Sequence, residues 1–133
     1  MIASAEWKQD HLYEGKTQSG HAILMDTAPE HKTGPSPMEV VLTALCGCTS
    51  VDVVSILQKK REPVEGLTVS AEAEQAPAPP RTFTKIHLTY RIRGKVNRKA
   101  AEDAVSLSKN KYCSVSKMLE NAATIDYSIE LDA

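Results

Sequence analysis

The stretch that decides the fold is residues 34–61, GPSPMEVVLTALCGCTSVDVVSILQKKR. Its opening predicts a helix start, because Ser36 can cap the first turn, Pro37 suits the first helical position and Glu39 can bond back to the cap. The basic run that closes the stretch favours a helix C-terminus, and a proline soon follows it. We therefore expect a central helix over residues 36–61, roughly 35 Å long.

This predicted helix is apolar on nearly every side. At about 100° per residue, its apolar side chains fall almost all the way round the helix. They are Val40, Val41, Leu42, Ala44, Leu45, Val51, Val53, Val54, Ile56 and Leu57. One antiparallel sheet and a short alanine-rich helix would leave much of this surface uncovered. We therefore expect an obligate two-fold homodimer in which the central helices are buried between sheets.

The rest of the chain contains alternating, strand-like segments and two short helices. The predicted order is N-terminal strands over 1–33 (about 2–8, 12–15 and 21–25), the central helix and a β-hairpin over 66–93. Two helices over 97–121, the first of them ending near Lys109, and a last strand over 124–131 follow. By length, residues 1–133 form a single domain. This order predicts an α+β fold with largely antiparallel sheets.

The composition limits the classes of partner. The chain has 16 basic and 17 acidic residues, a formal charge of −1, and no long run of either sign. Nucleic acid and anionic membranes are therefore not expected partners. The polar N-terminus lacks the apolar core of a signal peptide, and polar residues interrupt the longest apolar stretch. We expect a soluble, cytoplasmic protein.

Three cysteines are the candidates for chemistry. An odd number of cysteines in a chain without an export signal fits reduced thiols. Cys46 and Cys48 point about 200° apart on a helix, so they cannot pair with each other. No Cys-x-x-Cys and no spaced histidine pair accompanies them, and we expect neither a metal nor a bound cofactor. Composition alone favours the alternative that all three are small core residues.

Local features single out Cys48 and Cys113. Cys113 precedes a short predicted helix, whose N–H groups and dipole favour a thiolate. Cys48 shares its helix face with Asp52, and a carboxylate there would raise the pKa of the thiol. Cys48 would therefore need a nearby cation to act as a thiolate, and Asp52 would itself need a partner on a buried helix.

Three short segments, taken together, resemble the OsmC/Ohr family and within it the small YhfA-like branch. They are Ser36-Pro37-Met38-Glu39, Leu45-Cys46-Gly47-Cys48-Thr49 and Lys111-Tyr112-Cys113-Ser114-Val115. The likeness extends over essentially the full length, including the order of strands and helices. It implies an intertwined homodimer in which sheets from both chains wrap around two long central helices.

The resemblance also implies a cysteine-dependent peroxidase that acts on organic hydroperoxides. In that scheme the Cys48 thiolate attacks the peroxide O–O bond and becomes a sulfenic acid, which Cys113 converts to a disulfide. An external dithiol, dihydrolipoyl groups in well-studied members, then reduces the disulfide. Cys46 has no counterpart in this chemistry and is expected to pack in the core.

The sequence departs from the family pattern at the activating pair. Family peroxidases carry a glutamate ten residues before the reactive cysteine, where this chain has Met38, and Glu39 is half a turn out of phase with Cys48. The family's arginine from the N-terminal strands is also absent, because no arginine precedes Arg61. Alternative cations are Lys8, Lys16 and Arg81. We therefore expect peroxidase activity that is weak, differently activated or directed to another substrate.

A rival function keeps the fold without the chemistry. The dimer cleft around Cys48 would then bind a small apolar or acyl ligand, and the cysteines would be incidental. The distance between the Cys48 and Cys113 sulfurs distinguishes the two functions. A separation of about 4 Å, or one that a short local shift can close, favours redox cycling over ligand binding. A general thiol–disulfide exchanger is a third possibility, although the Cys-x-x-Cys that poises such centres is missing.

Other residues carry less signal. The four histidines show no ligand spacing, so a site role is not expected of any of them. Trp7 and Phe83 are expected to pack near the sheets. Tyr112, beside Cys113, either lines a pocket or belongs to the core.

Overall fold

A computed structural model describes all residues, 1–133, as two compact units, residues 1–42 and 43–133. The first unit contains three strands and the start of the long helix. The second contains the rest of that helix, three further strands and the short helices. Each unit is described by itself.

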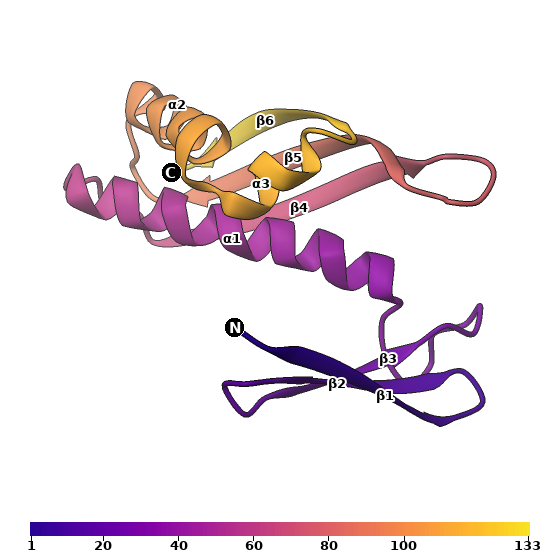
Figure 1. Ribbon diagram of the computed structural model, residues 1–133. Helices are drawn as coiled ribbons and strands as arrows, with labels where there is room; N and C mark the ends of the chain where they lie inside the picture. The colour runs from indigo at the N-terminus through magenta and orange to yellow at the C-terminus, as the bar shows by residue number, and fades with distance from the viewer. The chain divides into compact units, whose positions relative to one another are not determined.

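The first unit is a three-stranded antiparallel sheet in the order β1-β2-β3 (Figure 1). The strands are β1 (Ala3–Gln9), β2 (Leu12–Thr17) and β3 (Ala22–Asp26), which confirms the predicted N-terminal strands to within two residues. The turn after β1 places Asp10 at a φ of 48°, and Gly20 before β3 has a φ of 90°. Asn, Asp and Gly tolerate such backbone best, so the turn residues fit their positions.

Asp26 organises the loop that leads to the long helix. Its buried carboxylate accepts hydrogen bonds from the backbone N–H groups of Ala28 (2.9 Å) and Thr33 (3.2 Å), which lower the pKa of Asp26. At Gly34 a side-chain Cβ would collide with the Leu24 carbonyl, so this position needs glycine.

The long helix α1 (Pro37–Lys59) begins where the sequence predicts and ends within two residues of the predicted end. The Ser36 N–H donates to Glu39 Oε1 at 2.8 Å, and the Glu39 N–H donates to Ser36 Oγ at 3.2 Å. This reciprocal capping box confirms that Glu39 serves the helix start. By length and composition alone α1 could cross a membrane, a test that core helices of soluble proteins also pass.

The second unit has a sheet in the order β4-β5-β6. Strands β4 (Gly66–Gln75) and β5 (Phe83–Arg93) form the predicted antiparallel hairpin, with Gly66 opposite Arg93. Strand β6 (Thr124–Asp132) pairs parallel to β5, an exception to the largely antiparallel pairing that the sequence predicts. A helical connection returns the chain to the end of the sheet from which β5 starts, so β6 runs in the same direction as β5.

The hydrophobic core lies between this sheet and the helices. The inward face of β5 alternates as predicted, and its buried residues are Ile86, Leu88, Tyr90 and Ile92. Helix α1 contributes one stripe at four-residue spacing, Leu45, Thr49, Val53 and Leu57. Every buried apolar residue of the chain belongs to the second unit. The packing role of Phe83 is confirmed, whereas Trp7 is 65% exposed in this chain and its indole N–H donates to the Asp10 carbonyl.

The connection from β5 to β6 contains three consecutive helical segments. Helix α2 (Arg98–Leu107) is capped by Asn97, whose side chain accepts from the Ala100 N–H at 3.2 Å. The predicted continuation of this helix to Lys109 is wrong, because the chain changes at Ser108 to a π-helical turn, η1 (Ser108–Tyr112). The short helix α3 (Ser114–Leu119) follows, as predicted. The side chain of Ser108 is anchored to α1, which fixes the first residue of the turn.

Candidate functional site

The structure brings Cys48 and Cys113 together and keeps Cys46 apart from them. Cys48 lies near the middle of α1, and Cys113 is the fully buried N-cap residue of α3. The Cys48 thiol lies near enough to Cys113 to raise the pKa of the Cys113 thiol. Cys46 faces a different side of α1, where burial raises the pKa of its thiol. Helix phase therefore separates the three cysteines as predicted.

The surroundings of Cys113 disfavour its thiolate. Burial is the main cause that raises the pKa of Cys113, to about 11. The Ser116 N–H donates to Cys113 Sγ at 3.4 Å and works in the opposite direction. The Cys48 thiol and the Asp52 charge raise the pKa of Cys113 further. The N–H group at the helix start favours the Cys113 thiolate, as predicted, but burial outweighs it, so the pKa of Cys113 is raised overall.

A line of buried hydroxyl groups leads to Asp52. Thr49 Oγ1 lies 2.7 Å from Tyr90 Oη and 2.7 Å from Ser108 Oγ. Ser108 Oγ donates to Asp52 Oδ2 at 2.9 Å, which supplies the partner that Asp52 was predicted to need. Since each hydroxyl has one proton, Ser108 must accept from Thr49, and Thr49 in turn from Tyr90. All three protons thus point toward the carboxylate.

Burial raises the pKa of Tyr90 to about 12, so this first hydroxyl of the line stays protonated. Partial signals for the three hydroxyl residues are present in the sequence. Thr49 interrupts the buried stripe of α1, Tyr90 falls on the apolar side of its strand, and Ser108 falls on the small side of the predicted helix. Their mutual contact was not predicted.

Ser108 connects the carboxylate to the cysteine. Its side chain bonds Asp52, and its carbonyl accepts the Cys113 N–H at 2.8 Å, the bond that closes the π-turn. Turns of this kind occur frequently at functional sites. One residue therefore fixes both the carboxylate on α1 and the backbone of Cys113.

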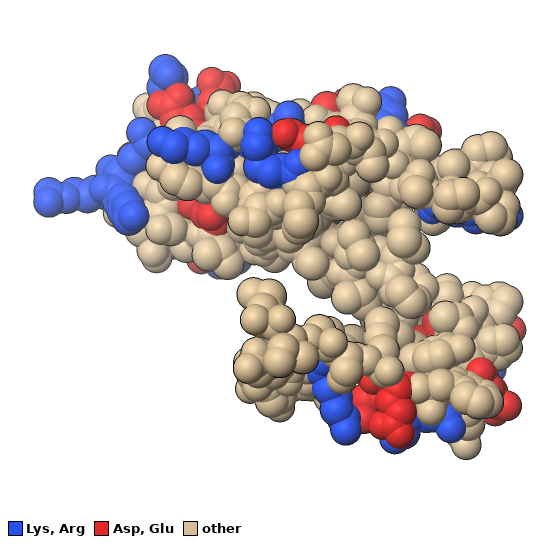
Figure 2. Space-filling view, viewed as in Figure 1, with Lys and Arg blue, Asp and Glu red and all other residues tan.

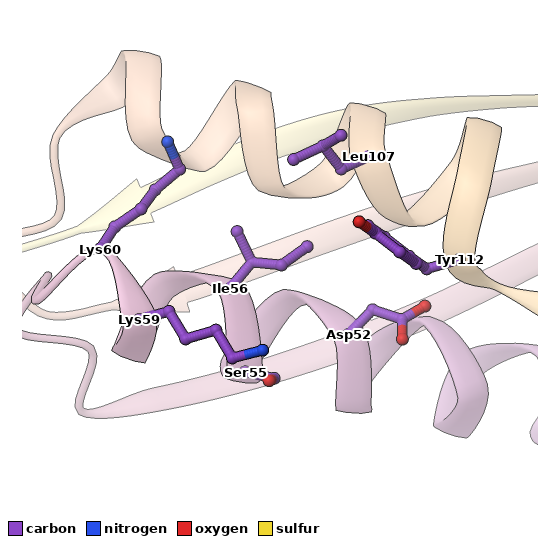
Figure 3. A pocket seen from close by; sticks show the side chains of 7 residues that line it. All are labelled: Asp52, Ser55, Ile56, Lys59, Lys60, Leu107 and Tyr112. Carbon is purple, nitrogen blue, oxygen red and sulfur yellow. The ribbon is translucent and has the colours of Figure 1, made fainter.

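A cavity of about 360 Å³ adjoins this cluster. Its walls come from α1, α2 and η1, and the lining residues are Asp52, Ser55, Ile56, Lys59, Lys60, Leu107 and Tyr112. Figure 3 shows Asp52 and Tyr112 at one end of the cavity and Lys60 at the other. Lys60 forms an ion pair with Asp103 at 3.8 Å. Of the two predicted roles for Tyr112, the structure supports the one in the pocket wall.

The candidate activating cations have other contacts. Lys8 and Lys16 form ion pairs with Glu6 (3.7 Å) and Glu14 (3.6 Å), each within its own strand. Arg81 lies in the loop between β4 and β5, where its carbonyl accepts from Gln75. No cation is among the groups that shift the pKa of Cys113. Figure 2 shows lysine and arginine side chains gathered near the end of α1 in the second unit, where residues 59–61 are exposed.

A second polar row lies on the opposite face of the sheet. His87 Nδ1 is 2.6 Å from Asp126 Oδ1, and His87 Nε2 is 3.0 Å from Ser128 Oγ. The order resembles a hydrolase triad, but the strand that carries His87 is central, so the ladders use its backbone N–H groups and none is free to bind an oxyanion. The row is also open to water, with the His87 side chain 38% exposed. We assign it to strand pairing.

The fold and the dithiol arrangement define a class of protein. A protein-family model described as OsmC-like protein matches residues 29–128. The chain belongs to the OsmC-like family, which confirms the resemblance drawn from the three short segments. The mixed α+β architecture matches solved OsmC-like structures and confirms the predicted fold class.

Individual relatives are similar over nearly their whole length. Protein YhfA of Escherichia coli K12 is 45% identical over 134 residues, which cover 100% of this chain and 99% of YhfA. A hypothetical protein from Aquifex aeolicus has a TM-score of 0.85 and 30% identity, covering 99% of this chain and 97% of its own. An organic hydroperoxide resistance protein OsmC from Legionella pneumophila has a TM-score of 0.74 at 16% identity, covering 97% and 95%, and this likeness concerns the fold alone.

Proposed function

We propose that this protein is a thiol-dependent peroxidase that reduces organic hydroperoxides through Cys48 and Cys113. The proximity of the two thiols carries the proposal, because a disulfide between neighbouring cysteines needs only a short local shift. Membership of the OsmC-like family supports a redox role, and the Legionella protein that shares the fold is named as an organic hydroperoxide resistance protein.

The proposed reaction has three steps. The Cys48 thiolate attacks one peroxide oxygen, the O–O bond breaks, and the alkoxide takes a proton and leaves as an alcohol. The Cys113 thiol then attacks the sulfur of the Cys48 sulfenic acid, a disulfide forms, and the hydroxyl leaves as water. An external dithiol, of which dihydrolipoyl groups are our candidate, returns both cysteines to thiols by two exchange steps and is itself oxidised to a disulfide. The cytoplasm, where such reductants keep thiols reduced, is the proposed location.

We expect slower turnover than the family scheme implies. Glu39 belongs to the helix cap, and Met38 occupies the position of the family's glutamate. No cation is among the groups that shift the pKa of Cys113, and the Asp52 charge raises that pKa.

We further propose that the active form is a homodimer. Val51, on α1, is 70% exposed, and only one stripe of this apolar helix is buried within the chain. The first unit has no buried apolar residue. A second copy of the chain is the cover that the OsmC-like family implies for both surfaces.

A stopped-flow experiment with cumene hydroperoxide tests the peroxidase proposal. We expect the parent to consume peroxide with formation of an intramolecular disulfide, and Cys48→Ser to consume none. Cys113→Ser should consume one equivalent and accumulate a sulfenic acid that dimedone traps. Cys46→Ser is the matched control on the same helix and should behave as the parent. Consumption by Cys48→Ser at the parent's rate would exclude the mechanism.

Binding without catalysis is the second candidate function. The cavity lined by Asp52 and Tyr112 favours it, since the apolar Ile56 and Leu107 and the charged Lys59 suit a small acyl ligand with an anionic head. This function predicts saturable binding of a short fatty acid by calorimetry, unchanged in Cys48→Ser, together with no peroxide consumption by the parent.

A further inference from the structure

Disulfide formation requires that Cys113 lose a proton. Its thiol is fully buried, and the nearest charges oppose ionisation. At neutral pH almost no thiolate would exist in advance, so the proton must pass to an acceptor as the S–S bond forms. The proposed peroxidase cycle, on which this inference rests, leaves that acceptor unassigned.

Asp52 is the carboxylate that Ser108 links to Cys113. It lies one turn after Cys48 on α1, and its charge reaches the Cys113 thiol. Ser108 holds the carboxylate at 2.9 Å through its hydroxyl and holds the Cys113 N–H at 2.8 Å through its carbonyl. His87 of β5 is not placed to accept the Cys113 proton, because its ring bonds Asp126 and Ser128 on the opposite face of the sheet.

We propose that Asp52, positioned by Ser108, accepts the proton of the Cys113 thiol as the Cys48–Cys113 disulfide forms. In the peroxidase cycle the Cys113 S–H bond breaks, the proton moves to the Asp52 carboxylate, and the sulfur bonds to Cys48. Asp52 then returns the proton to the departing hydroxyl, which leaves as water. The carboxylate is regenerated, and no proton is gained or lost overall.

The surrounding titratable groups are few. From α1 they are Cys48 and Asp52 itself, with Lys59 and Lys60 farther along the cavity. From β5 the group is Tyr90, which stays protonated. From η1 the groups are Tyr112 in the cavity wall and Lys111, whose Nζ lies 5.2 Å from the centroid of the Tyr112 ring. Because Asp52 also lines the open cavity, it can exchange a proton with solvent.

Replacement of Asp52 by asparagine gives opposite results under the two possible roles. If the carboxylate acts only through its charge, Asp52→Asn removes a group that opposes the Cys113 thiolate, and disulfide formation becomes faster. If Asp52 accepts the proton, the same substitution slows disulfide formation, because the amide keeps the shape and the hydrogen bond from Ser108 but cannot take a proton.

The test uses dithiobis(nitrobenzoate) with the full-length protein in a Cys46→Ala background. Attack by Cys48 releases a first aryl thiolate, and attack by Cys113 on the resulting mixed disulfide releases a second. We expect Asp52→Asn to leave the first phase undiminished and to slow the second roughly 10- to 100-fold at neutral pH, the scale of a lost general base. The slowed phase should recover about tenfold per pH unit toward alkaline pH, as hydroxide takes over, whereas the second phase of the parent should depend less on pH.

Controls separate this role from a structural one and from the peroxidase proposal. Asp126→Asn, on the opposite sheet face, should leave both phases unchanged, and Ser108→Ala should slow the second phase to a smaller extent than Asp52→Asn. A second phase that is unchanged or faster in Asp52→Asn would overturn the inference. This reagent contains no peroxide, so the test does not depend on peroxidase activity. If the peroxidase proposal alone fails, the parent will show a normal second phase with this reagent but will not consume cumene hydroperoxide.

Discussion

Single residues determine how this site titrates. Tyr90 and Cys113 are both fully buried, and burial holds both side chains in their protonated forms. Both belong to the same cluster as Asp52, whose Oδ2 accepts a hydrogen bond from the Ser108 hydroxyl. The cluster therefore concentrates its negative charge on one carboxylate.

Alkaline pH should destabilise the reduced protein through these two residues. Their pKa values rise on folding, for Tyr90 from 10.0 to about 12 and for Cys113 from 9.0 to about 11. The unfolded chain thus ionises first, and stability is constant below about pH 9 and falls as the pH rises from there toward 12. For Tyr90 the loss is about 2 kcal/mol.

Urea unfolding with a reductant present, repeated at several pH values, measures this effect. Tyr90→Phe should lose less stability than the parent between about pH 10 and 12, and Cys113→Ser should lose less from about pH 9. Thr89→Ala, next to Tyr90 on the other face of β5, is the control and should follow the parent. An alkaline loss in Tyr90→Phe equal to that of the parent would contradict the assignment.

Some residues of the site could be predicted from local sequence patterns, and others could not. Cys48 and Cys113 could be chosen from local motifs, and Asp52 from the physical need of a charge on an apolar helix for a partner. Which hydroxyl meets Asp52 depends on contact between α1 and a segment 56 residues away in sequence, which no local pattern encodes. The raised pKa of Cys113 depends on burial, which also becomes visible only in the folded chain.

Among the elements, the π-turn η1 has the greatest effect on the site. It places Cys113 at the start of α3 with its N–H bonded to the Ser108 carbonyl. The residues of η1 would suit an ordinary helix, and the sequence predicts one to Lys109. The contacts of Ser108 with Thr49 and Asp52 are tertiary, so the change of helix type could not be predicted locally.

Shortening this turn by one residue should separate the thiols. Asn110 is exposed, and its side chain bonds only Ser106, at 3.2 Å. Deleting it leaves a turn of α-helical length and rotates the residues that follow by about 100°, which carries Cys113 away from Cys48. We expect the second phase with dithiobis(nitrobenzoate) to disappear while Cys48 still reacts.

Asn110→Ala is the matched control, since it removes the side chain and keeps the length. It should retain both phases. Disulfide formation in the deletion variant at the parent's rate would show that the turn does not determine where Cys113 lies.

The direction of strand β6 is the second feature that was predicted less well from the sequence. Its alternation identified a strand but carries no information on direction. The helical connection after β5 was visible in the sequence, and a connection of that kind favours a parallel return. The information was therefore present, in the order of elements rather than in the strand itself.

At the scale of the whole molecule, many apolar residues are not buried within one chain. The sequence predicts a helix that is apolar all round, and within one chain the helix buries one stripe. The exposed apolar residues include Ile2, Trp7, Ile23, Leu24, Val51 and Met118. Surfaces of this kind mark sites of association between proteins.

A charge on the exposed side of α1 should therefore prevent association. We expect the parent to sediment as a dimer at low micromolar concentration and to unfold at a higher urea concentration as protein concentration rises. Val51→Lys should sediment as a monomer and unfold earlier. Ser70→Lys, at an exposed polar position of β4, is the control and should remain dimeric. A parent that sediments as a monomer would exclude the homodimer.

The absence of buried apolar residues from the first unit has a consequence for biosynthesis. Residues 1–42 leave the ribosome before any other part of the chain, but they bring no interior of their own to fold around. A small sheet of this kind is marginal in water until something covers it. The second unit, by contrast, contains all of its buried apolar side chains and can condense as soon as β6 is made. The first third of the chain thus emerges first and folds last.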